Sequence, residues 1–199
     1  MKRFIILFIL ALACHRSESE PPAVSTDTAT TSTMVRNDTT GTNTGTGATG
    51  GTVSTLSVAD KDFIMKAAQG GMAEVALGTL AAQQGTDAGV KSFGNRMTND
   101  HGKANDELKA LATNKGLALP MDLDAEGQKT QKELSKKIGE DFDKAYMDDM
   151  VKDHEKDVAE FHKETTAAQD ADLKAWVSKT LPTLQDHLKL AKETAGKIK

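Results

Sequence analysis

Residues 90–111 read VKSFGNRMTNDHGKANDELKAL, and the spacing of their apolar side chains predicts one long amphipathic α-helix. Apolar residues recur at three- and four-residue steps, the period that places side chains on one face of a helix. The apolar stripe consists of Val90, Phe93, Met97, Ala104, Leu108 and Leu111. His101 falls within this stripe, so we expect its side chain to point into the protein interior.

Three other segments carry the same helical pattern. Capping residues at Ser57 and Asp170, together with glycines at helix ends, divide the chain into helices. The predicted long helices cover residues 58–84, 86–115, 140–168 and 171–195, and a shorter one covers 124–137. No segment alternates apolar and polar residues at period two, so no strand is expected. The chain is therefore predicted to be all-α, a four-helix bundle with the short helix in the crossover between the second and third long helices.

The pattern around His101 occurs a second time, 53 residues further on. The sequence Met-x-x-Asp-His-x-Lys begins at Met97 and again at Met150, so that His154 corresponds to His101. A third Asp-His pair ends at His187 in the last long helix. Three histidines are therefore expected on the inward faces of three different helices.

Glu74 and these three histidines lie at similar positions along their predicted helices. Each is 14 to 16 residues from the predicted start of its helix, which is about 21–24 Å at a rise of 1.5 Å per residue. Helix midpoints coincide whether neighbouring helices run parallel or antiparallel. We therefore expect Glu74, His101, His154 and His187 to face one interior space.

Four segments are typical of a known family. They read Asp62-Phe-Ile-Met-Lys-Ala-Ala, Phe93-Gly-Asn-Arg-Met-Thr-Asn-Asp-His, Tyr146-Met-Asp-Asp-Met-Val-Lys-Asp-His and Thr180-Leu-Pro-Thr-Leu-Gln-Asp-His-Leu. On these segments, residues 57–195 resemble the bacterial ferritin-like family known as domain of unknown function 4142. The resemblance implies a ferritin-like four-helix bundle in an exported, often envelope-associated protein. It implies no established activity.

One hypothesis for the four residues is a metal site. The wider ferritin-like class often holds two irons with Glu-x-x-His motifs, but Thr98, Val151 and Leu184 stand where those glutamates would be. A single ion, zinc or iron, bound by Glu74 and the histidines fits the residue types better. Methionines one turn before two histidines make copper a weaker variant. The residues expected to orient the ligands are Asp100, Asp153, Asp186 and Tyr146.

The competing hypothesis is a hydrogen-bonded core cluster, in which the imidazoles pair with Glu74, Tyr146 or the flanking aspartates.

Catalysis is disfavoured, because the chain has no Gly-x-Ser-x-Gly elbow and no phosphate-binding glycine loop. A formal net charge of −4 and the lack of a basic stripe argue against a nucleic-acid partner. The sequence favours a binding or envelope stress/structural module that is not an enzyme. A metal-binding redox or storage protein is the alternative, and no protein partner is identified.

The N-terminal residues predict export and a lipid anchor. Residues 1–13 have a positive head and a ten-residue apolar run, which suits a signal peptide. They end in Leu-Ala-Leu-Ala before Cys14, which resembles a bacterial lipobox and predicts a lipidated cysteine. Residues 14–56 are rich in Thr, Gly and Ser and predict a disordered tether to the domain at 57–199. We expect an envelope lipoprotein, held in the outer membrane and facing the periplasm.

Overall fold

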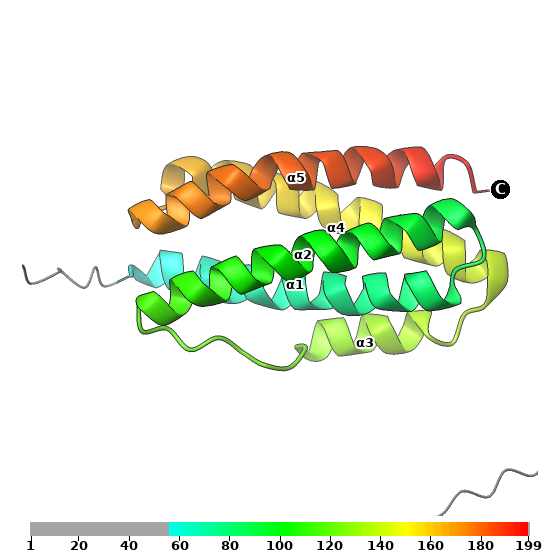
Figure 1. Cartoon of the computed structure of the whole chain (residues 1–199), viewed down its shortest axis with the longest axis horizontal. Helices are drawn as coiled ribbons and strands as arrows, with labels where there is room; N and C mark the ends of the chain where they lie inside the picture. Colours follow the sequence, from blue (N-terminus) through cyan, green and yellow to red (C-terminus); the bar gives the residue numbers. More distant parts are fainter. Residues whose placement is uncertain (1–55, 199) are drawn as a thin grey trace, which may run out of the picture. The chain divides into compact units, whose positions relative to one another are not determined.

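The computed structural model describes residues 56–198, which form five α-helices (Figure 1). They are α1 Val58–Gln84, α2 Ala88–Asn114, α3 Ala125–Leu134, α4 Gly139–Ala167 and α5 Ala171–Ala195. Cys14, the leader and nearly all of the tether lie outside the described residues. Within residues 56–198, no helix is long and apolar enough to cross a membrane. The helix boundaries agree with those predicted from sequence to within three residues.

The long helices pair into two hairpins, α1 with α2 and α4 with α5. The hairpins pack together, with α2 against α5 and α1 against α4, and the crossover runs along the outside of the bundle (Figure 1). Helix α3 lies within this crossover and packs mainly against α1. The domain is therefore a ferritin-like four-helix bundle with one short extra helix, as the sequence predicted.

A buried carboxylate of each hairpin closes the turn of the other. Ser57 caps α1 by accepting the Asp60 N–H at 3.0 Å. The Asp60 side chain accepts the N–H groups of Gln169 and Asp170, which lie in the turn between α4 and α5, both at 3.1 Å. Ser57 therefore caps α1 as the sequence predicted, and the Asp60 carboxylate satisfies the α4–α5 turn.

The turn between α1 and α2 is held in the same way, by a buried carboxylate of the other hairpin. Asp143 of α4 is 1 % exposed, and it accepts the N–H of Thr86 at 2.9 Å and that of Asp87 at 2.7 Å. Backbone N–H groups in a buried turn need such partners. Since each hairpin closes the other's turn, the midpoints of the four long helices are held at one level.

Two apolar clusters fill the bundle on either side of that level. One cluster includes Ile64, Leu108, Phe161, Leu173 and Trp176, and the other includes Leu77, Phe93, Met97, Phe142 and Met150. In every long helix a buried polar residue separates members of the two clusters; these residues are Glu74, His101, His154 and His187. The core is therefore interrupted at its midpoint by a single polar layer.

Candidate metal centre

The three histidines meet in the polar layer from three helices. His101 comes from α2, His154 from α4 and His187 from α5. Their ring centroids are 5.3 to 5.7 Å apart, and each ring offers a nitrogen that lies within 4.8 Å of the others. They are 6 %, 0 % and 1 % exposed. The structure thus brings together the three histidines that the sequence placed at helix midpoints.

Two of the rings are oriented by hydrogen bonds. His154 donates its Nδ1–H to the carbonyl of Met150, one turn earlier on α4, at 2.9 Å. His187 donates its Nε2–H to the Asp100 carboxylate at 2.8 Å. Burial alone would raise the pKa of Asp100, but hydrogen bonds from His187 and Arg96 lower it and keep the acceptor ionised. These bonds leave the lone pair on Nε2 of His154 and on Nδ1 of His187.

Three of the four remaining ring nitrogens are buried and have no hydrogen-bond partner within the described part of the chain. They are Nε2 of His101, Nε2 of His154 and Nδ1 of His187, and all three are buried. The hydrogen-bonded core cluster expected from the sequence is formed in part, by His187 with Asp100, and it leaves these three nitrogens unpaired among the described residues. A tetrahedral metal with three imidazole ligands needs nitrogens about 3.4 Å apart. Starting from separations within 4.8 Å, ring movements of about 1 Å or less would suffice.

Burial holds the histidines in the neutral form that binds metals. Burial, followed by the nearby His154 and His187, lowers the pKa of His101 to about 3. Burial, followed by His187, lowers the pKa of His154 to about 4. Burial also lowers the pKa of His187, against the opposing effect of Asp100. All three imidazoles are therefore uncharged near neutral pH and need no deprotonation to act as ligands.

Glu74 lies beside the histidine cluster and not within it. Its Oε1 is 3.7 Å from Nδ1 of His154, the nitrogen already bonded to the Met150 carbonyl. Glu74 is fully buried, and the Asp153 carboxyl lies beside it. Burial and the neighbouring Asp153 raise the pKa of Glu74 well above its usual value. The predicted four-ligand set is therefore replaced by three histidines with a buried carboxyl group behind one of them.

The four residues expected to orient the ligands have different roles in the structure. Asp100 holds His187, as described. Asp153 borders Glu74 and a cleft, and Asp186 is exposed and makes no hydrogen bond to a histidine in the described region. Tyr146 is buried and stacks on Phe142, and its hydroxyl is likewise without a partner there. The Met150 carbonyl was missed because sequence alone does not show which backbone group a histidine contacts.

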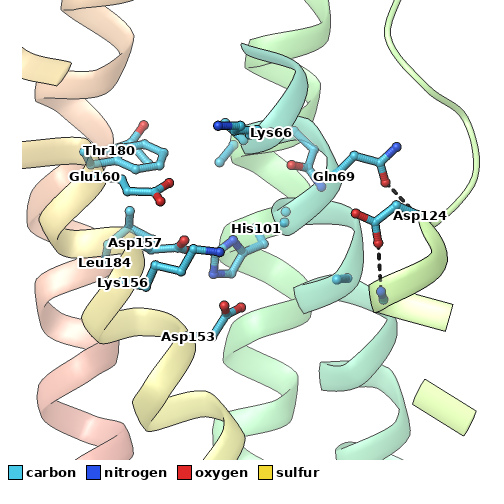
Figure 2. Close-up of a pocket in the computed structure, with 18 of the residues that line it drawn as sticks. Lys66, Gln69, His101, Asp124, Asp153, Lys156, Asp157, Glu160, Thr180 and Leu184 are labelled. Carbon is cyan, nitrogen blue, oxygen red and sulfur yellow. Dashed lines mark hydrogen bonds between the residues drawn. The ribbon is translucent and has the colours of Figure 1, made fainter. Parts of the chain in front are cut away.

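A cleft of about 500 Å³ opens beside the cluster, with residues from all five helices in its walls (Figure 2). His101 lines this cleft, whereas His154 and His187 do not. Acidic side chains of α4 line the opposite wall; they are Asp149, Asp153, Asp157 and Glu160. The cleft was not predicted, because it depends on the spacing between α1 and α4 and not on any local pattern.

Comparisons with known proteins agree with this architecture. The chain is similar to a solved structure described as "Crystal structure of DUF305 fragment from Deinococcus radiodurans", with a TM-score of 0.63 and 12 % identity. The match covers 71 % of this chain and 98 % of that chain, and at this identity it shows the fold alone. No match was found among curated proteins. The family model described as "Domain of unknown function (DUF4142)" matches residues 46–194, most of the chain, and the chain therefore belongs to the DUF4142 family.

Proposed function

We propose that this domain is a metal-binding module whose ligands are His101, His154 and His187. The observation that carries the proposal is the cluster of three buried histidines: they offer ring nitrogens within 4.8 Å of one another, and each has a buried ring nitrogen with no hydrogen-bond partner among the described residues. Leaving a polar atom buried and unpaired costs about 1–3 kcal/mol. A bound cation would satisfy all three nitrogens at once.

The surroundings of the rings support the same assignment. In metal sites, a ligating histidine commonly donates its other N–H to a carboxylate or a backbone carbonyl, which fixes the ring orientation. His187 and His154 make these two kinds of bond, to Asp100 and to the Met150 carbonyl. Imidazole ligands suit zinc, iron and copper. Three neutral imidazoles leave a coordination position for a further ligand on zinc or iron, and we place these two metals ahead of copper.

Elemental analysis of the protein, purified without a histidine tag, tests this function. We expect about one equivalent of zinc or iron per chain, or full uptake of one equivalent of added Zn²⁺ by metal-free protein. Bound metal should raise the unfolding temperature, and a chelator should reverse that rise at constant pH. Protein that contains no metal, and whose unfolding temperature does not respond to Zn²⁺, Fe²⁺ or Cu²⁺, would contradict the proposal.

We also propose that the bundle is attached to the outer membrane by lipid on Cys14 and faces the periplasm. The support is the apolar leader that ends in Leu-Ala-Leu-Ala before this single cysteine. Cys14→Ser should shift the protein from the membrane fraction to the soluble fraction after cell disruption, as measured by immunoblotting. The helical circular dichroism of the purified protein should not change. Equal membrane retention of Cys14→Ser would refute the anchor.

A further inference from the structure

The histidine cluster is buried, and the cleft provides a physical connection from solvent to it. His101 is 6 % exposed, its Nε2 has no partner in the described chain, and it is the member of the cluster that lines the cleft. Figure 2 shows the His101 ring extending from α2 toward the α4 side of the cleft. An ion that enters the cleft therefore meets His101 before the other two ligands.

The α4 wall of the cleft carries closely spaced carboxylates. Asp149, Asp153 and Asp157 follow one another at four-residue intervals, which places them on one helix face about 6 Å apart along the axis. Glu160, three residues further along α4, also lines the cleft and continues this row. We name Asp149, Asp153, Asp157 and Glu160 the acidic row.

The charges of the acidic row are not neutralised by ion pairs. Asp149, Asp157 and Glu160 form no salt bridge within residues 56–198. Burial, then Asp153 and Glu160, raises the pKa of Asp157 to about 7. Lys66 and Lys156 are the basic residues in the cleft lining, against six carboxylate side chains. The cleft is thus a region of net negative charge beside an unpaired imidazole.

We propose that the acidic row is an outer binding site for hydrated divalent cations, from which the ion passes along the cleft to His101 and the other two histidines. This inference rests on the proposed metal-binding function. Carboxylate oxygens bind hydrated divalent cations readily, and imidazole nitrogens hold transition metals more selectively. A negatively charged cleft with low-dielectric walls also concentrates cations and raises their association rate. The outer row accelerates loading, and the histidines determine the equilibrium affinity.

Stopped-flow absorbance with Co²⁺ as the probe tests the electrostatic part of this inference. The variant Asp157→Asn/Glu160→Gln removes two ionisable carboxyl groups from the acidic row, and measurement at about pH 8, above the pKa of Asp157, keeps both groups charged in the wild-type protein. The control Asp141→Asn/Asp148→Asn removes two charges from exposed α4 positions outside the cleft lining. We expect the first variant to slow Co²⁺ association about fivefold at low ionic strength, and the control less than about twofold. The difference should disappear in about 0.5 M salt, where surface charges are screened.

A bulky, uncharged side chain placed in the cleft tests whether the ion reaches the histidines through the cleft. Gly70 lines the cleft, and a Cβ built there meets no atom within 4 Å, so the leucine side chain of Gly70→Leu starts in open space and narrows the cleft. Gly102 is also helical and equally open but lies outside the lining, which makes Gly102→Leu the matched control. Gly70→Leu should slow Co²⁺ association and dissociation by similar factors, about threefold or more, and leave the dissociation constant unchanged. Gly102→Leu should bind and release Co²⁺ at wild-type rates.

These measurements separate failure of the route from failure of the site. If both cleft variants bind Co²⁺ with wild-type rate and affinity, the acidic row does not load the site, and the histidine site stands. If wild-type protein binds no Co²⁺ at the histidines, the proposed function fails, and this inference fails with it.

Discussion

Replacing His154 by alanine is expected to abolish stoichiometric metal binding, with affinity for Zn²⁺ reduced by more than about 100-fold. His154 is fully buried, and its free Nε2 supplies one of only three nitrogens in the cluster. The two remaining histidines cannot complete a three-nitrogen site, and no other described group of His, Cys, Asp and Glu has ligand atoms close enough to replace it. Competition with a chromophoric chelator measures the affinity directly.

Two further variants separate a metal ligand from a core residue. His162→Ala changes an exposed histidine on the same helix, and it should bind Zn²⁺ as wild type does. Asp100→Asn keeps the side-chain shape but weakens the charged hydrogen bond to His187, so affinity should fall about 10-fold. Circular dichroism checks that each variant is folded. A folded His154→Ala variant with wild-type affinity would exclude His154 as a ligand.

The histidine cluster could be predicted from sequence because it depends on two simple periodicities. Helical spacing placed His101, His154 and His187 on inward faces, and counting from the caps placed them near helix midpoints. Both steps survive boundary errors of a few residues, because one helical residue advances only about 1.5 Å. The carboxylates Asp60 and Asp143 then hold the hairpins so that the midpoints coincide.

Glu74 shows where this reasoning stops. Its position along α1 was predicted correctly, and it is buried in the polar layer. Which edge of His154 it approaches depends on ring rotation, and the Met150 carbonyl determines that rotation. A periodicity argument gives the level and the face of a side chain but not the direction of a ring nitrogen. For the same reason, the sequence could not show that three buried ring nitrogens lack hydrogen-bond partners among the described residues.

The glycines of α1 illustrate a second limit of sequence analysis, because glycines of the same helix have different surroundings in the structure. Gly70 and Gly78 both lower helix propensity. A Cβ at Gly78 would lie 2.7 Å from the carbonyl oxygen of Gly94, whereas one at Gly70 would meet nothing within 4 Å. One glycine therefore permits close packing of α1 against α2, and the other leaves the cleft open. Only the three-dimensional structure distinguishes these two uses.

The second large effect is expected at this helix contact, where Gly94→Ala should destabilise the domain. A Cβ at Gly94 would lie 2.6 Å from the Gly78 carbonyl oxygen and 2.9 Å from both Cβ of Ala81 and the backbone N of Ala82. Two of these atoms are backbone, so α1 and α2 must separate to accommodate the methyl group. Overpacking of this kind costs about 1–3 kcal/mol, and occasionally more. The higher helix propensity of alanine offsets at most about 1 kcal/mol of this cost, so we expect a net loss of about 1–2 kcal/mol in the free energy of unfolding, measured by urea unfolding followed by circular dichroism.

Gly70→Ala is the matched control, because it makes the same chemical change on a neighbouring helix where the space is open. It should raise the free energy of unfolding by up to about 1 kcal/mol, since alanine favours the helix and meets no clash. The opposite signs would show that the close approach of α1 and α2, and not helix propensity, governs Gly94. Gly94 also lies two turns before His101, so separation of the helices should displace that ring and weaken Zn²⁺ binding in Gly94→Ala alone. A Gly94→Ala variant at least as stable as wild type would mean that the contact between the two helices can relax without cost.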